Sequence, residues 1–260
     1  MINFDKIDKD IERLKDLFGK DGIFEYVVID DFCDADKLLE LVKQIPDPNI
    51  DGVNKSRDYM FAKNKFEKSK YSQYGELFSE LHKDLVSDRF KEQLKIITGE
   101  DVFVDEEFHG GGLHQGGAGS YLNMHADFNY HPVHNDWFRN LNILLYLNHG
   151  WKKEYGGQLK LKHKTTGERA EVEPLFNRCV IMFTRDYTLH GYDPISFPDG
   201  HYRRSLAAYA YSKKDSPDNV RSTTWYPEDG GVIKKMLGKN WPKLVKVKNK
   251  LFGSSTTKNK

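Results

Sequence analysis

A histidine and an aspartate two residues apart, near the middle of the chain, are the residues most suited to chemistry. His125 and Asp127 lie in the run Tyr121-Leu-Asn-Met-His-Ala-Asp-Phe-Asn129. Side chains on a β-strand alternate between its faces, so a strand here would direct both toward the same side. An imidazole and a carboxylate presented together are two of the three ligands of a 2-His-1-carboxylate site. Such a site suits non-haem Fe(II) and leaves positions open for a co-substrate and O2.

A third ligand has to come from a distant strand, because His-x-Asp alone occurs by chance in many proteins. His190 fits this role. It follows the apolar segment Val180-Ile-Met-Phe183 and precedes the turn residues Asp193-Pro194, which places it at the end of a predicted strand. The chain between Asp127 and His190 is long enough for four strands with their turns. The sequence therefore predicts a metal site at the mouth of a barrel.

The next predicted strand carries a candidate receptor for a carboxylate. By alternation, Arg203, Ser205 and Ala207 share one face of this strand. A guanidinium that faces inward is costly unless it has an anionic partner, and its planar fork binds a carboxylate through two hydrogen bonds. Arg204 is the rival, since a register slip of one residue would turn it inward instead.

The elements that must position these residues are short strands backed by helices. Helical spacing of apolar residues predicts helices over 7–18, 34–45 and 77–97, with a strand at 23–29 between the first two. From about residue 101 to 211, short strands separated by turn signals indicate an antiparallel sandwich or barrel. We therefore expect a mainly β protein with flanking helices. It divides into an N-terminal helical support region of the same domain (1–100), a β core (101–215) and a basic C-terminal extension (216–260).

Composition excludes several classes of function. The chain has 260 residues, 38% of them hydrophobic and 30% charged, with a formal net charge of +1. This balance provides no overall field that would draw the protein to nucleic acid or a membrane. Its start lacks the pattern of a secretory signal, and no apolar stretch is long enough to cross a bilayer. Cys33 and Cys179 are too far apart for a metal-binding spacing, so we expect a cytoplasmic protein with two buried thiols.

Together these motifs resemble the Fe(II)/2-oxoglutarate-dependent oxygenases, and their prolyl 4-hydroxylase-like branch in particular. The resemblance rests on His-x-Asp, the distal histidine and Arg-x-Ser in that order. Three further segments support it, namely Arg139-Asn-Leu-Asn-Ile-Leu-Leu-Tyr-Leu-Asn148, Tyr155-Gly-Gly-Gln-Leu159 and Tyr26-Val-Val-Ile-Asp-Asp-Phe32. It is strong over residues 115–211, weaker over 23–45 and absent beyond about 215. It implies a double-stranded β-helix, or jelly-roll, core.

The resemblance also implies roles for individual residues. His125, Asp127 and His190 would be the catalytic triad that binds Fe(II), and Arg203 would bind the distal carboxylate of 2-oxoglutarate. Ser205, Tyr146 and Tyr121 would line the same co-substrate pocket. The implied reaction uses O2 to hydroxylate an unactivated C–H bond while 2-oxoglutarate becomes succinate and CO2, with ascorbate as an optional reductant. Asp127 argues against halogenation, because halogenating relatives replace this carboxylate with a small residue.

The substrate and several residues stay open. A prolyl 4-hydroxylase-like reaction on a peptide is the leading hypothesis, ahead of a free amino acid or small metabolite. Two hypotheses of a different class are a non-redox, cupin-like barrel that binds a small molecule and a metal-dependent hydrolase or isomerase. The segment 47–75 reads as a lid or a plain surface loop, and the basic C-terminal extension as a solvated surface or a contact for an anionic partner. We expect His131 and His134 in a loop at the substrate entrance rather than as metal ligands, and His109 and His114 at the surface rather than in contact with substrate. Tyr130 and Trp137 either line the pocket or cover the barrel rim.

Overall fold

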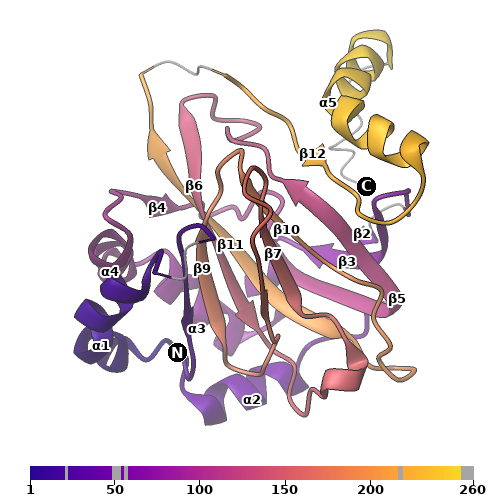
Figure 1. The fold of residues 1–260 in the computed structure, drawn as a ribbon. Helices are drawn as coiled ribbons and strands as arrows, with labels where there is room; N and C mark the ends of the chain where they lie inside the picture. Colours follow the sequence, from indigo (N-terminus) through magenta and orange to yellow (C-terminus); the bar gives the residue numbers. More distant parts are fainter. Residues whose placement is uncertain (21–22, 49–53, 56–57, 216–218, 253–260) are drawn as a thin grey trace.

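A curled antiparallel sheet forms the centre of the molecule (Figure 1). The computed structural model describes residues 1–20, 23–48, 54–55, 58–215 and 219–252. The neighbouring strands along the sheet are β1 (Tyr26–Ile29), β9 (Cys179–Phe183), β6 (Trp137–Tyr146), β11 (Arg203–Lys213), β5 (Gly112–Ala126), β10 (Thr188–Tyr192), β7 (Leu159–His163) and β8 (Arg169–Val172). Four short or peripheral strands join this path, namely β2 (Asn54–Lys55), β3 (Ala62–Lys68), β4 (Phe103–Val104) and β12 (Thr224–Trp225).

The long strand β5 connects the two halves of the sheet. Its first part pairs with β11, in a register that places Gly116 opposite Arg203. Its last part pairs with β10 and places His125 opposite His190. Strand β5, which carries His125, thus brings the strand with Arg203 and the strand with His190 to a common centre. This arrangement confirms the mainly β, double-stranded β-helix fold that the sequence indicated.

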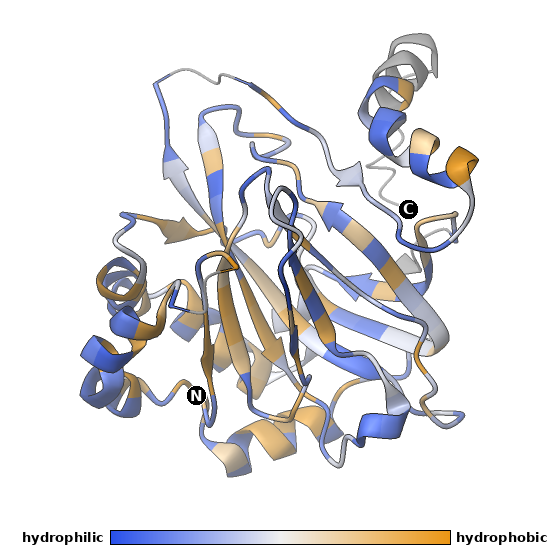
Figure 2. Cartoon of the chain, in the orientation of Figure 1, coloured by the Kyte–Doolittle hydropathy of each residue, from blue (hydrophilic) through white to orange (hydrophobic). Residues whose placement is uncertain are grey.

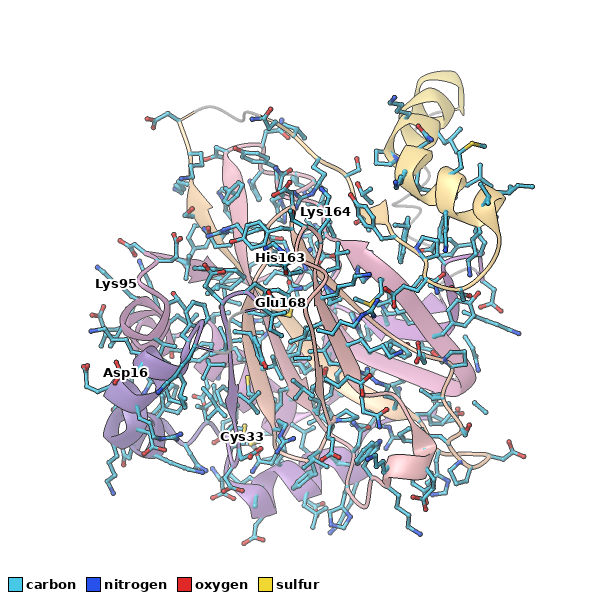
Figure 3. All side chains as sticks on the ribbon, in the orientation of Figure 1. Asp16, Cys33, Lys95, His163, Lys164 and Glu168 are labelled. Carbon is cyan, nitrogen blue, oxygen red and sulfur yellow. The ribbon has the colours of Figure 1, made fainter. Side chains whose placement is uncertain are left out.

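Four helices cover one face of the sheet. They are α1 (Phe4–Leu17), α2 (Ala35–Lys43), α3 (Glu76–Leu85) and α4 (Asp88–Thr98). Asp34 caps α2 by accepting a hydrogen bond from the Lys37 amide (3.0 Å), as its position before the helix predicted. Apolar residues of the helices and of β1, β6, β9 and β11 form one core. Figure 2 shows hydrophobic residues concentrated in β9 and β11, and Figure 3 shows Asp16 of α1 and Lys95 of α4 pointing away from it.

Alternation along β11 separates this core from the inner side of the barrel. Leu206, Ala208 and Ala210 face the helices, whereas Ala207 and Tyr209 face the concave side. The two cysteines are free and buried, and Cys33 lies near α2 at the lower end of the sheet in the view of Figure 3. They behave as the small buried side chains that the sequence predicted.

One segment differs from the sequence-based expectation. The segment 47–75 is not simply a loop, because it contains β3, which pairs with β5, and a short 3-10 helix (Tyr71–Tyr74). Its Lys- and Asn-rich composition concealed the strand, since only Ala62 and Phe66 of β3 are buried. Residues 49–53 and 56–57 of this segment lie outside the described part.

The C-terminal extension forms α5 (Val232–Phe252), a helix that continues through Pro242. Residues 216–218 and 253–260 of this extension lie outside the described ranges. None of the helices in the described part of the chain combines the length and the apolar character needed to cross a membrane.

Helix α5 contacts the sheet at a glycine, which gives a first prediction. A Cβ at Gly238 would lie 2.7 Å from the carbonyl oxygen of Trp225. Gly→Ala inside a helix normally stabilises it by about 1 kcal/mol, but here the added methyl must displace α5. We expect Gly238→Ala to weaken docking of α5 by about 1–3 kcal/mol, measured as faster hydrogen exchange of its amides. Gly231→Ala is the matched control, because nothing lies within 4 Å of the Cβ it would add. Equal exchange in both variants would contradict close docking.

Candidate functional site

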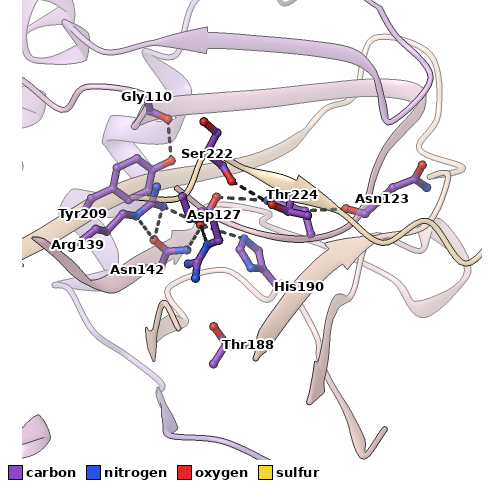
Figure 4. Close-up of polar contacts among 12 residues, drawn as sticks. Gly110, Asn123, Asp127, Arg139, Asn142, Thr188, His190, Tyr209, Ser222 and Thr224 are labelled. Carbon is purple, nitrogen blue, oxygen red and sulfur yellow. Dashed lines mark hydrogen bonds and ion pairs between the residues drawn. The ribbon is translucent and has the colours of Figure 1, made fainter. Parts of the chain in front are cut away.

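The structure brings His125, Asp127 and His190 together. One ligand atom from each lies within 4.8 Å of the others. The Nε2 atom of His125 is 3.5 Å from Oδ1 of Asp127, and Nε2 of His190 is 3.4 Å from Oδ2. Figure 4 shows His190 directed at the carboxylate. His190 reaches this position because the next residue, Gly191, has no side chain. A Cβ there would lie 2.5 Å from the Leu122 carbonyl of β5.

Both imidazoles are held in a form that can bind a metal. Nδ1 of His125 lies 2.9 Å from the carbonyl oxygen of Asn123. A carbonyl only accepts hydrogen bonds, so Nδ1 carries a proton, and in this tautomer Nε2 is the nitrogen that offers a lone pair to a metal. Burial, followed by the neighbouring His125, lowers the pKa of His190 to about 3. His190 is therefore neutral at physiological pH.

A buried arginine that the sequence analysis did not single out holds the carboxylate. Arg139 is 1% exposed, and its Nη2 donates to Oδ2 of Asp127 (3.0 Å). The side-chain amide of Asn142 donates to the same oxygen (2.9 Å) (Figure 4). Burial alone would raise the pKa of Asp127, but the charge of Arg139, together with the neighbouring His190 and His125, outweighs it and keeps the pKa well below its usual value. Oδ2 is thus engaged by two donors, which leaves Oδ1 for a metal.

An irregularity in β6 explains why strand alternation did not reveal Arg139. Arg139 and Asn142 are three residues apart, a spacing that puts side chains on opposite faces of a regular strand. The pairing with β11 skips Asn140, since Leu141 lies opposite Ala210 and Arg139 opposite Tyr211. An extra residue of this kind turns both side chains to the same face. The guanidinium also lies 3.4 Å from the centre of the Tyr209 ring, a cation–π contact.

Arg203 faces the inner side of the barrel, in the register that the sequence predicted. Its Nε donates to the carbonyl of Gly157 (2.7 Å), and Nη2 lies 3.5 Å from the hydroxyl of Tyr146. No carboxylate in the described part of the chain pairs with this buried guanidinium. Ser205 and Tyr146 lie opposite each other on β11 and β6, and burial raises the pKa of Tyr146, so its hydroxyl stays a donor. These groups form a receptor for an anion.

Arg204 points to the other face, where its Nε donates to Oε1 of Gln115 (2.9 Å). Tyr121 also lies away from the receptor. Its hydroxyl contacts the Met60 carbonyl at 3.4 Å, and it is not among the residues that line the cavity. The aromatic residue beneath the Arg203 guanidinium is instead Tyr192, with 4.2 Å to its ring centre. Tyr192 could not be identified from the sequence, because only the fold shows that its ring lies against Arg203 of β11.

A cavity of about 260 Å³ joins the triad to the anion receptor. It is lined by residues of both sites together with side chains from β3, β5 and the C-terminal extension. Among the lining residues are Lys65 and Glu67 of β3, His114 and Leu122 of β5, Leu144, Leu159 and Tyr192 of β6, β7 and β10, and Trp225 of β12. His114 lines the cavity, in contrast to the surface position expected for it.

His109 and His131 belong to a separate cluster with Asp105, outside this cavity. Nδ1 of His131 accepts hydrogen bonds from the amides of Val133 (3.1 Å) and His134 (2.9 Å). The proton of neutral His131 is therefore on Nε2, which faces Asp105 at 3.4 Å and has no lone pair for a metal. This cluster ties two loops together, and Trp137 covers it by stacking on His134. Tyr130, buried beside Phe138, does not line the cavity.

The triad fits Fe(II) by its donor set. Two imidazole nitrogens and one carboxylate oxygen converge at the cavity, where they would hold the metal and leave room for further ligands. A neutral His190 and an ionised Asp127 are protonation states that metal binding requires. Arg139 and Asn142 orient the carboxylate from behind, as outer partners of metal ligands do.

Arg139 gives a prediction about metal affinity. Arg139→Met removes the counter-charge of Asp127, so we expect the affinity for Fe(II), or for Mn(II) as a stable substitute, to fall about 10–100-fold. Isothermal titration of the purified protein measures this change. Arg185→Met is the matched control, because Arg185 pairs with Glu100 (3.0 Å) and packs on Phe183 away from the cavity. Equal metal affinity in the two variants would show that Arg139 does not support the site.

The two adjacent arginines give a second prediction. Arg203→Ala removes charge-assisted hydrogen bonds, and we expect the Kd for 2-oxoglutarate to rise at least roughly tenfold. Arg204→Ala should change it less than about threefold, since Arg204 faces Gln115. Binding measured with Mn(II) in the site tests this difference. A larger effect from Arg204→Ala would show that the anion receptor is on the other face of β11.

Comparisons with known proteins agree with this geometry. Residues 109–211 match the model of the 2OG-Fe(II) oxygenase superfamily. No curated protein sequence matches the chain. A prolyl-4-hydroxylase from Pseudomonas putida has a similar structure, with a TM-score of 0.57 and 17% identity, over 77% of this chain and 100% of that one.

Two further solved structures share the fold. A prolyl hydroxylase from Trichoplax adhaerens, solved with a peptide fragment of hypoxia inducible factor, has a TM-score of 0.56 and 16% identity, over 78% of this chain and 91% of that one. The epimerase SnoN, solved with Fe3+, alpha ketoglutarate and nogalamycin RO, has a TM-score of 0.55 and 13% identity, over 86% and 97% of the two chains. Residues 109–211 therefore match a 2OG-Fe(II) oxygenase domain, and the match together with the triad indicates a dioxygenase that uses Fe(II), 2-oxoglutarate and O2.

Proposed function

We propose that this dioxygenase hydroxylates an unactivated C–H bond of one residue in a polypeptide, as a prolyl 4-hydroxylase does. The size of the cavity carries this proposal. At about 260 Å³ it is small for a ligand pocket. With 2-oxoglutarate at the Arg203 end, the remaining space suits a group of about one side chain. The main chain of a peptide would then lie at the mouth. The Trichoplax prolyl hydroxylase, whose fold is similar, was solved with a peptide.

The residues of the site have separate tasks in this reaction. Fe(II) and 2-oxoglutarate, when bound, supply the activation of O2, which gives one oxygen atom to the substrate and one to succinate, with loss of CO2. Arg139 keeps Asp127 ionised, and burial keeps His190 neutral, so both remain ligands. Arg203, with the hydroxyl of Tyr146 nearby, orients the distal carboxylate of 2-oxoglutarate. The apolar side chains of Leu122, Leu144 and Leu159 limit water around the reacting C–H bond.

A free amino acid is the second candidate, and one observation favours it. Lys65 and Glu67 of β3 both line the cavity, and Lys65 Nζ lies 3.8 Å from Glu67 Oε2. These opposite charges could exchange their mutual contact for the carboxylate and ammonium groups of a zwitterion. A non-redox barrel and a metal-dependent hydrolase or isomerase, both compatible with the sequence motifs alone, are not favoured, because residues 109–211 match the oxygenase family.

One assay tests the proposal. Purified protein with Fe(II), 2-oxoglutarate and O2 is offered, in parallel, a pool of short peptides blocked at both ends and a mixture of free amino acids. Succinate is quantified and products are analysed by mass spectrometry for the gain of one oxygen atom. We expect the peptide pool to stimulate succinate formation and to contain the oxidised product. Asp127→Ala is the control and should form neither.

The outcomes separate the two candidates. Oxidised product among the free amino acids alone would overturn the peptide proposal. In that case Glu67→Gln should lower turnover of the amino acid, because it removes the partner of the ammonium group. Peptide product with unchanged activity in Glu67→Gln would support the peptide proposal.

A further inference from the structure

The C-terminal extension, which lies beyond the residues that match the family, forms part of the cavity wall. Strand β12 pairs with β5 so that Trp225 lies directly opposite His125. The indole and imidazole rings face each other with 4.7 Å between centres and 31° between planes. Trp225 is 4% exposed and lines the cavity. A residue outside the common oxygenase core is thus in contact with a predicted metal ligand.

Several contacts fix this position of Trp225. Its ring stacks on Phe61 at 5.2 Å with 7° between planes. The next residue, Tyr226, donates its amide to the Met124 carbonyl of β5 (2.7 Å). Two residues further, Glu228 accepts from Arg169 Nη1 (2.7 Å), which ties the extension to β8. Helix α5 then closes on the Trp225 carbonyl at Gly238. The indole is therefore held in place before any ligand binds.

The indole N–H of Trp225 is buried and has no hydrogen-bond acceptor in the described part of the chain. An indole nitrogen can only donate, so whatever satisfies it must bring an oxygen or other acceptor. Trp151 shows the usual situation, because its Nε1 donates to the Gly156 carbonyl (2.9 Å). Buried polar groups without a partner are rare and are costly to retain. In a residue that lines the cavity, such a donor points to a bound ligand.

The position of the indole N–H in the cavity indicates which kind of ligand accepts its hydrogen bond. Arg203 and Ser205 of the anion receptor lie on β11, which pairs with the first half of β5, and Tyr146 lies on β6, the next strand beyond β11. Trp225 adjoins the last half, beside His125. It is thus placed on the metal side of the cavity, away from the groups that hold the distal carboxylate. An uncharged donor in a dry site suits a neutral carbonyl oxygen better than a carboxylate, which needs a counter-charge.

We infer that the indole N–H of Trp225 donates a hydrogen bond to a carbonyl oxygen of the substrate next to the carbon that is hydroxylated. This inference rests on the proposed function. It makes Trp225 a substrate-binding residue contributed by the C-terminal extension. The amide carbonyl of a peptide residue is the chemical group that fits it.

Nuclear magnetic resonance of the indole N–H groups tests this directly. The full chain is labelled with 15N-tryptophan and loaded with Zn(II), which does not react with O2. Its four tryptophans each give one indole signal, and Trp225→Phe identifies that of Trp225. Three additions are compared, namely 2-oxoglutarate alone, then the pool of blocked peptides, or instead the free amino acids. We expect the Trp225 proton to move downfield with peptide and to stay in place with 2-oxoglutarate alone. The signal of Trp241 serves as control, since Trp241 touches Phe61 but does not line the cavity.

Each outcome has a defined meaning. A Trp225 signal that already moves downfield with 2-oxoglutarate assigns the donor to the co-substrate and overturns the inference. A signal that stays fixed with every addition also overturns it. A shift with free amino acids but not with peptides would assign the donor to a carboxylate oxygen, which overturns the inference and also contradicts the peptide proposal. A fixed Trp225 signal in a protein that does oxidise the peptides would overturn the inference alone.

Kinetics provide a second readout. Trp225→Phe keeps an aromatic ring against His125 and Phe61 but removes the N–H. The KM for the substrate should rise roughly three- to tenfold, the range for loss of one hydrogen bond, while the Kd for 2-oxoglutarate stays within about twofold. Trp241→Phe should change neither value. An unchanged KM in Trp225→Phe would contradict the inference.

Discussion

The site depends on one buried ion pair, between Asp127 and Arg139. A carboxylate as buried as that of Asp127 would ordinarily take up a proton, and a protonated carboxyl is a poor metal ligand. Arg139 prevents this by placing a full positive charge 3.0 Å from Oδ2, and Asn142 adds a donor to the same oxygen. The guanidinium is in turn held by the faces of Tyr209 and Phe128. This arrangement keeps the Asp127 carboxylate ionised, orients it toward the cavity and leaves its Oδ1 atom available to a metal.

The rest of the fold positions that pair against the other ligands. Because β5 pairs with β11 at its start and with β10 at its end, it brings Arg203 and His190 to the same cavity although neither is near His125 in sequence. The N-terminal helices pack on the opposite face of β9, β6 and β11 and form one hydrophobic core with them. The C-terminal extension adds the wall next to His125. The N-terminal part of the chain thus supports the sheet, and the C-terminal part contributes directly to the cavity.

Much of this could be predicted from the sequence because alternation along strands is a local property. It placed His125 with Asp127 and Arg203 with Ser205 correctly, and separated Arg203 from Arg204. It did not identify Arg139, because the extra residue at Asn140 breaks the alternation. Tyr192 and Trp225 were also missed, since their place depends on which strands become neighbours in the fold. Strand β3 was not predicted as a strand, because its polar composition resembles that of a loop, although Lys65 and Glu67 line the cavity.

The most direct test of this account is a crystal structure of the protein with Mn(II) and 2-oxoglutarate, with the metal located by anomalous scattering. The account predicts one metal ion bound by Nε2 of His125, Oδ1 of Asp127 and Nε2 of His190. It also predicts the distal carboxylate of 2-oxoglutarate on Arg203, and no metal at Asp105, His109 and His131. A metal bound by that second cluster, or a 2-oxoglutarate carboxylate away from Arg203, would contradict it.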